Sequence, residues 1–489
     1  MNLNYMLLIR ITGYITAIIG VAMIPCAAVS QVYKEYNMMN SFLKVSIPLV
    51  IVGIILIKTI NQKQNVLRMR DGLLIVAVCW LTASLLGTLP YILSGHVTNF
   101  IHAYFESVSG FTTTGSSVLE NLSDLPKGLL FWRSLSTWLG AMGILVLAIS
   151  ILPTLGIGAQ NIARAETTGP TLDKVTTKIS DNARILYLMY FGLSSIEVIL
   201  FLIGGLNLYD AVIHTFGSMG TGGLSNYELG ISDFNSLYVE TIISIFSVFA
   251  SINFIAYNHI IHGQFKAFFK EPEIRMFFAF LTGAVLIVTA GLFVTNTYDS
   301  VFESFRYGAF QVISFMSTSG YVTSDYGGWP LITKFILFTL LFIGGCSAST
   351  SGGIKVIRVT VLFKLIKRSM YKVMHPRAVV AVKLWGKGVP AVVVSNITVF
   401  ILLFMVIFLG GALVLSLDNI SMETAFNASI SSLSNTGIGF GDIGYGMTFD
   451  YFSDGSLLVL TFLMLTGRLE LFTIIMLFFP SFWRPDKFR

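Results

Sequence analysis

Charged residues are scarce in this sequence: Asp, Glu, Lys and Arg make up 11% of its 489 residues, against about 25% in soluble proteins. Apolar residues reach 54%, and the mean hydropathy is +0.78. A chain with so little polar surface does not fold as soluble domains, although its length would suffice for about three of them. Because apolar runs occur along the whole chain, the composition predicts one all-α integral membrane domain.

Cysteine is also rare, and the usual catalytic patterns are missing. Cys26, Cys79 and Cys346 lie in apolar stretches without paired spacing, which excludes a disulfide framework or a cysteine metal cluster, so we expect packing residues. Acidic residues are scattered, and residues 217–222 (GSMGTG) lack the lysine of a phosphate-binding loop. We therefore expect no enzymatic activity and no cofactor.

Basic residues give the chain a net charge of +6, and their positions matter more than their sum. Lys and Arg cluster in alternate loops and at both ends, which by the positive-inside rule face the cytoplasm. We interpret this pattern as a topology signal in a cytoplasmic membrane, with lipid around the protein and no nucleic-acid partner. The basic loops are 58–70, 153–184, 259–275 and 355–390.

Apolar stretches of about 20 residues, enough to span a bilayer, occur ten times. Ten spans place both termini in the cytoplasm. The first stretch is too long for a signal peptide and lacks a convincing cleavage site, so we expect it to be retained as a span. The ten lie near residues 7–30, 43–60, 72–94, 128–152, 185–206, 237–260, 276–295, 331–366, 391–415 and 454–479.

A shorter motif recurs four times between successive spans, on the outer side. Each copy is a weakly apolar stretch, too short to cross, followed by a turn rich in Gly, Thr and Ser, and so predicts a re-entrant segment. Aligned on Gly115, Gly223, Gly320 and Gly437, the copies read AYFESVSGFTTTGSS, AVIHTFGSMGTGGLS, GAFQVISFMSTSGYV and AFNASISSLSNTGIG.

The repeats divide the chain into five parts. An N-terminal two-helix hairpin (1–70) precedes four tandem units of span, pore helix and span around one central pore. These units are residues 71–160, 161–265, 266–375 and 376–489. The short pore helices are predicted to start near four residues that favour the N-cap position: Asn99, Asp210, Ser300 and Ser421.

Four non-helical turns at membrane depth require burial in protein or a water-filled cavity. If they meet on one axis, their carbonyl oxygens can replace the hydration shell of a cation. The pore helices enter from outside, so their partially negative C-terminal ends point at the pore centre and favour cations. The pattern therefore predicts a channel for cations.

The four hairpins with one glycine per turn resemble the superfamily of K⁺ transporters that includes the Trk, Ktr and HKT proteins. The N-terminal hairpin and the stretches FIGGCSASTSGGIKVIRV, HPRAVVAVK and TGRLELFT resemble the TrkH/TrkG family within it. The resemblance implies K⁺ uptake through a selectivity filter, with K⁺ bound there. The filter residues would be Thr113, Thr114, Gly115, Thr221, Gly222, Gly223, Thr318, Ser319, Gly320, Asn435, Thr436 and Gly437.

The family also suggests how selective this filter is. Serine in place of the first filter glycine accompanies Na⁺ permeation in the superfamily, and this chain has Gly115, so we expect K⁺ selectivity. None of the copies reads TVGYG, so the selectivity is expected to be modest.

Ten consecutive small residues, 344–353, interrupt the apolar stretch 331–366 and cannot form a robust helix. The resemblance implies that this loop is the gate; the alternative is a close-packing kink.

Arg468 lies about midway along the last span. The matching arginine of the family implies an electrostatic barrier below the filter; the alternative is an ion pair with Glu470 or Glu197. The gate residues would be Gly345, Cys346, Ser347, Ala348, Ser349, Thr350, Ser351, Gly352, Gly353 and Arg468.

Three other charged or titratable residues have simpler interpretations. Lys355 and Arg358 fit ordinary positive-inside residues better than charges at the inner mouth, and His214 fits a packing and hydrogen-bonding residue.

The resemblance further implies a homodimer regulated by a cytoplasmic TrkA-type subunit that binds NAD or ATP. A second hypothesis is a secondary cation transporter coupled to H⁺ or Na⁺, although the repeats share one orientation instead of being inverted.

Overall fold

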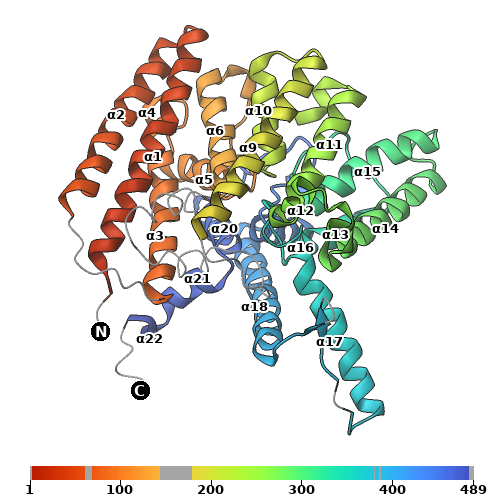
Figure 1. The fold of residues 1–489 in the computed structure, drawn as a ribbon. Coiled ribbons are helices and arrows are strands. Elements are labelled where there is room, and N and C mark those ends of the chain that lie inside the picture. The colour runs from red at the N-terminus through yellow and green to blue at the C-terminus, as the bar shows by residue number, and fades with distance from the viewer. Residues whose placement is uncertain (1–2, 61–68, 144–178, 379, 385–386, 484–489) are drawn as a thin grey trace.

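The computed structural model describes residues 3–60, 69–143, 179–378, 380–384 and 387–483. The described chain is helical apart from one two-stranded antiparallel hairpin, β1 (Lys383–Leu384) and β2 (Lys387–Gly388). The N-terminal and C-terminal ends lie at the same end of the molecule, and the hairpin lies toward that end too (Figure 1). The prediction of an all-α membrane protein is confirmed in its class.

The N-terminal hairpin consists of α1 (Tyr5–Val32) and α2 (Tyr36–Thr59), which pack along one another. Glycines allow the two backbones to approach: a Cβ atom at Gly53 would lie 2.7 Å from the carbonyl oxygen of Gly13. Small residues at helix contacts are typical of membrane bundles, where dispersion and hydrogen bonds replace the hydrophobic effect. Ser46 adds such a bond, its hydroxyl donating to the Gly20 carbonyl at 2.6 Å.

The remaining helices form four successive units. The first contains α3 (Met69–Gly87), α4 (Leu89–Leu93), α5 (Phe100–Phe111) and α6 (Lys127–Ala141). The second contains α9 (Ile179–Ile203), α10 (Leu208–Met219), α11 (Leu237–Ser251), α12 (Tyr257–Ile261) and α13 (Phe265–Lys270). The third contains α14 (Pro272–Val294), α15 (Val301–Ser317), α16 (Leu331–Ile343) and α17 (Val356–Met374). The fourth contains α18 (Ala391–Leu415), α19 (Met422–Leu433), α20 (Asp454–Arg468), α21 (Phe472–Ile475) and α22 (Pro480–Trp483).

The four units close into a ring through their pore helices. Within each unit the pore helix (α5, α10, α15 or α19) packs against the helices before and after it. Each pore helix also contacts the second span of the preceding unit: α6 packs on α10, α11 on α15, α16 on α19, and α20 on α5. The last contact joins the fourth unit to the first. The predicted division at residue 160 lies outside the described residues, and the other divisions stay predictions.

Six helical segments in the described chain are long and apolar enough to cross a membrane, and two further pairs of helices qualify only as bent spans. The predicted spans 237–260 and 454–479 correspond to these two bent pairs. The chain bends by 92° after α11 and by 113° after α20. The predicted span 128–152 is helical as far as Ala141, and its part beyond residue 143 lies outside the described residues.

A common feature of the second spans is that each helix stops early. The helices α6, α11 and α20 have 15 residues and α16 has 13. At 1.5 Å per residue they extend about 20–23 Å, less than the 30 Å of a hydrocarbon core. The described helix of each second span is therefore shorter than the hydrocarbon core is thick.

Candidate functional site

Each pore helix begins with a side-chain cap. Asn99, Ser300 and Ser421 accept hydrogen bonds from backbone N–H groups in the first turns of α5, α15 and α19, as predicted. For α10 the prediction of Asp210 is wrong, because Asn207 is the cap and accepts from the Asp210 N–H at 2.9 Å. Both residue types favour this position, and the helix begins at the earlier one.

The C-terminal ends of the pore helices share one geometry, a Schellman motif. In each, the residue before the turn glycine donates its N–H to the carbonyl five residues back. These bonds are Thr114 to Ser109 at 2.9 Å, Gly222 to Gly217 at 3.0 Å, Ser319 to Ser314 at 3.0 Å and Thr436 to Ser431 at 2.9 Å. The helices thus end at equivalent places in all four repeats, and the predicted turns follow directly.

Two positions before each turn glycine, a residue other than glycine adopts the left-handed conformation. The φ values are 57° at Thr113, 51° at Thr221, 56° at Thr318 and 55° at Asn435. For a β-branched residue such as threonine this conformation is strained, at a cost of about 1–3 kcal/mol each. Strain at three equivalent threonines, with the same conformation at Asn435, indicates a backbone shape that the rest of the structure imposes.

The turn glycines bring the four repeats into contact. All four have positive φ: 83° at Gly115, 55° at Gly223, 71° at Gly320 and 80° at Gly437. A Cβ atom on each would overlap the carbonyl oxygen of the residue before the glycine in the next repeat. These oxygens belong to Gly222, Ser319, Thr436 and, closing the circle, Thr114. The predicted turn residues therefore form one ring of carbonyl groups and glycine Cα atoms.

The small-residue loop, residues 344–353, separates α16 from α17 as predicted and lies directly against this ring. The Gly352 N–H donates to the Thr318 hydroxyl at 2.8 Å, and the Gly353 N–H donates to the Ser434 carbonyl at 3.1 Å. A Cβ at Gly352 would overlap that carbonyl. Close approach of loop and turns thus requires glycine here.

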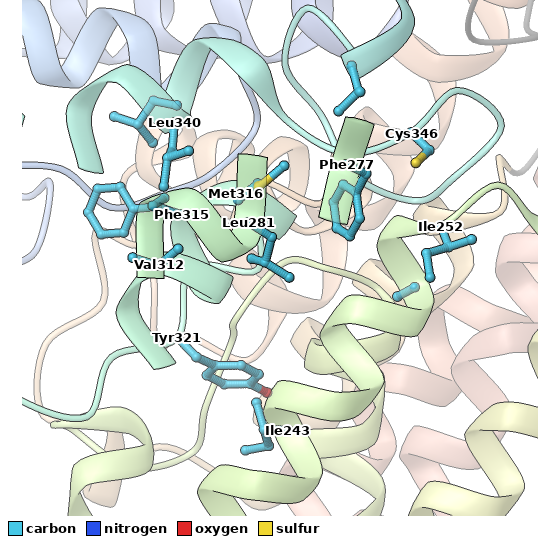
Figure 2. Close-up of a cluster of buried hydrophobic side chains, with 14 of the residues drawn as sticks. Ile243, Ile252, Phe277, Leu281, Val312, Phe315, Met316, Tyr321, Leu340 and Cys346 are labelled. Carbon is cyan, nitrogen blue, oxygen red and sulfur yellow. The ribbon is translucent and has the colours of Figure 1, made fainter. Parts of the chain in front are cut away.

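The other side of the loop is bound to the break after α11. Cys346 and Thr350 donate their N–H groups to the carbonyls of Ser251 and Ala250, at 2.8 and 3.2 Å. Cys346 is fully buried beside Phe277 and Ile252 (Figure 2), which agrees with its predicted role as a packing residue. The loop therefore has a defined structure made from non-local partners.

Glu273, near the start of α14, holds the tip of the loop. One carboxylate oxygen accepts from the Ser347 N–H and the other from the Ser347 hydroxyl, both at 2.6 Å. The Glu273 residue is only 4% exposed. Glu273 was not predicted as a site residue, because its only local signal is an acidic residue in the first turn of a helix.

Arg468 is the last residue of α20 and lies at the bend, near the middle of the predicted span 454–479. Its guanidinium donates to the carbonyls of Gly140 and Ala141 at 2.6 Å, to the Thr350 carbonyl at 2.9 Å and to the Thr113 hydroxyl at 3.2 Å. One cation thus joins the end of α6, the small-residue loop and the first turn.

The two acidic partners considered for Arg468 have other contacts. The Glu470 carboxylate pairs with Arg358, and the Glu197 carboxylate accepts from the Ser218 hydroxyl at 2.5 Å. Arg468, Arg358, Lys355 and Glu470 line a cavity between the loop and the bend after α20. Lys355 and Arg358 are only 2% and 6% exposed, so both side chains are buried at this cavity.

His214 has the structural role that was predicted for it. The buried ring contacts the Asp210 carbonyl through Nδ1 at 2.8 Å and the Ser225 hydroxyl through Nε2 at 3.1 Å. It packs between the rings of Tyr227, Phe234 and Tyr321.

Comparison with known proteins gives one consistent result. The family model TrkH, described as a cation transport protein, matches residues 38–484. The chain is similar to the Trk system potassium uptake protein TrkH of Escherichia coli K12, at 33% identity over 99% of this chain and 100% of that protein. It is also similar to Trk system potassium uptake protein TrkG of that organism, at 31% identity over 96% and 97% of the two chains.

A solved structure matches the fold at full length. The crystal structure of the potassium transporter TrkH from Vibrio parahaemolyticus superimposes with a TM-score of 0.89 and 31% identity, covering 99% of this chain and 100% of that one.

Proposed function

Because the chain belongs to the TrkH family of cation transport proteins, we propose that it is the membrane subunit of a potassium uptake system. The relatives named above are Trk system potassium uptake proteins. The observation that carries the proposal is the closed ring in which each turn glycine contacts a carbonyl of the next repeat. Such a ring supplies the oxygen ligands that replace the hydration shell of a cation.

The selectivity filter in this proposal consists of the twelve predicted turn residues. The paired left-handed positions, one at the helix end and one at the glycine, hold the intervening carbonyls in a ring. Glycine at 115 keeps the ring free of side chains where the first repeat meets the second. The expected preference is for K⁺ over Na⁺, with few oxygen rings and hence modest selectivity.

The gate in this proposal is the small-residue loop together with Arg468. The loop lies against the third and fourth turns, and Arg468 lies between the loop and the first turn. A positive charge directly below the filter repels a cation leaving it. Conduction therefore requires the loop and Arg468 to move away together.

Regulation is proposed to come from a cytoplasmic TrkA-type subunit that binds NAD or ATP. The Trk system names of the relatives point to an assembly of several subunits. The basic segment α17 projects at the end where both termini lie (Figure 1), and offers a docking element for an acidic partner. In this proposal the transporter is a homodimer in the bacterial cytoplasmic membrane, with both termini in the cytoplasm.

The test is cation uptake by purified protein in liposomes. Rb⁺ uptake is measured with and without imposed H⁺ and Na⁺ gradients, and Na⁺ uptake is measured in parallel. A channel-like K⁺ pathway gives Rb⁺ uptake driven by the Rb⁺ gradient alone. Uptake that requires an H⁺ or Na⁺ gradient favours the coupled secondary transporter, and no cation uptake even with the partner subunit contradicts the proposal.

A further inference from the structure

A second ring of hydrogen bonds lies just beyond the four turns. The carbonyl two residues after each turn glycine accepts a hydrogen bond from the preceding repeat. Ser117 accepts from the Phe449 N–H at 2.7 Å, Ser225 from Arg133 Nη1 at 3.1 Å, Val322 from the Ser232 hydroxyl at 3.4 Å and Gly439 from the Tyr326 hydroxyl at 2.8 Å. We call these four carbonyls and their donors the outer collar.

The donors of the outer collar differ in kind although the acceptors are equivalent. They are a backbone amide, a guanidinium, a serine hydroxyl and a tyrosine hydroxyl. A hydrogen bond from a charged donor is stronger and more directional than one between neutral groups. The collar carbonyl of the second repeat therefore accepts a charge-assisted hydrogen bond, and Arg133 of the first repeat is its donor.

Arg133 is paired as well as hydrogen-bonded. Its Nε lies 3.1 Å from Oε2 of Glu106, and the two side chains are 4% and 0% exposed. The other carboxylate oxygen, Oε1, accepts from the Ser117 hydroxyl at 2.5 Å and from the Val118 N–H at 2.7 Å. The pair thus binds the segment after the turn in repeat one and the collar carbonyl of repeat two.

The residue type at the position of Glu106 differs among the repeats. It stands nine residues before the turn glycine, where the other repeats have His214, Gln311 and Ala428. His214 also contacts the residue two after its glycine, Ser225. Within the described residues, the Gln311 amide has no hydrogen-bond partner. Polar support behind the turns is therefore concentrated in repeats one and two.

A buried ion pair is weak evidence for stability, because desolvation offsets the attraction between the charges. Its clearer effect is geometric. The planar guanidinium fork fixes Glu106 and the Ser225 carbonyl at set positions around one group, which a flexible lysine cannot do. Because Glu106 and Ser225 belong to adjacent repeats, this fork sets the distance between two sides of the ring.

We propose that Glu106 and Arg133 form a positioning pair that sets the preference of the filter for K⁺ over Na⁺. This inference rests on the proposed function, in which the four turns bind the transported ion. Discrimination between the two ions depends on the size of the ring and the number of its carbonyls. A pair that fixes the spacing of repeats one and two affects the size of the ring without contacting the ion.

The test is Arg133→Lys, which keeps the charge and removes the fork. In liposomes, the ratio of Rb⁺ to Na⁺ uptake is expected to fall about tenfold, the equivalent of one charge-assisted hydrogen bond, while Rb⁺ uptake persists. The matched control is Arg306→Lys. Arg306 forms a bidentate ion pair with Glu240, at 2.7 Å for both contacts, that likewise bridges two repeats. It lies near the start of α15, away from the turn, so its uptake ratio should not change.

The outcomes separate this inference from the function on which it rests. An unchanged ratio in folded Arg133→Lys protein, or an equal fall in Arg306→Lys, overturns the positioning role. Absence of cation uptake by the unsubstituted protein overturns the proposed function instead. If Arg133→Lys does not fold, the neutral double variant Glu106→Gln with Arg133→Gln removes both charges together, and the same fall in the ratio is expected from it.

Discussion

Gly115 and its three counterparts occupy positions where no other residue fits without moving the next repeat. Each has positive φ, and each Cα faces a carbonyl of its neighbour. The two restrictions are independent, since one concerns the backbone of the residue itself and the other concerns space. At this scale the ring depends on the absence of four side chains.

Gly115→Ser tests this dependence. The new Cβ overlaps the Gly222 carbonyl and must displace it, so we expect the ratio of Rb⁺ to Na⁺ uptake to fall about tenfold, equivalent to about 1.4 kcal/mol. The measurement is paired uptake in liposomes. The control is Gly95→Ser, because Gly95 also has positive φ, 76°, but no atom within 4 Å of its added Cβ. Equal effects of the two substitutions would assign the change to backbone strain and not to the ring.

At the scale of elements, the second spans are the distinctive part of the fold. Each ends after 13 or 15 residues, yet the segments that follow differ. In the second repeat the chain turns into short helices, in the third it forms the small-residue loop, and in the fourth it bends at Arg468. The early ends create room below the turns, and the loop and Arg468 fill part of it.

Deleting residues 346–351 should open this room. The deletion removes the contacts of the loop with Ser251, Ala250 and Glu273, and we expect basal Rb⁺ uptake without a partner subunit to rise severalfold. The milder variant Glu273→Gln keeps the loop but weakens its charge-assisted hydrogen bonds, by about 1–2 kcal/mol, and should raise uptake less. Unchanged uptake by a deletion variant that elutes as a single folded species would contradict the gating role.

At the scale of the whole molecule, one element extends beyond the membrane bundle. The helix α17 packs on β1 and the start of α18 through a small apolar cluster that includes Ile357, Val361 and Leu384. Its basic residues Lys367 and Lys372 are exposed. Because α17 continues directly from the small-residue loop, a force on this helix reaches the loop through the backbone.

Replacing the exposed charges should uncouple a regulatory partner without closing the pore. For Lys367→Gln with Lys372→Gln, we expect unchanged basal Rb⁺ uptake and about tenfold weaker binding of an acidic cytoplasmic partner, an effect that fades at high salt. The control is Lys34→Gln with Lys44→Gln, near the turn between α1 and α2 at the opposite end of the hairpin from the N-terminus. Equal loss of binding in both variants would show that total charge, not α17, matters.

The sequence by itself determined the class of this protein and the positions of its turns. Long apolar runs indicate segments in lipid. Such segments must be helical, because a helix forms all its backbone hydrogen bonds internally. The glycines of the four turns were identifiable because one backbone geometry, repeated four times, admits few residue types. Three of the four pore-helix caps followed for the same local reason.

The tertiary structure alone decided which groups surround those turns. The contacts of Arg468 with Gly140, of Glu273 with Ser347 and of Arg133 with Ser225 join residues far apart in the chain, and no local pattern marks them. The bends after α11 and α20 were also invisible, because an apolar run reads alike whether straight or bent. Hydropathy reports the solvent around a residue, whereas the partners of a buried charge depend on how the four repeats close into a ring.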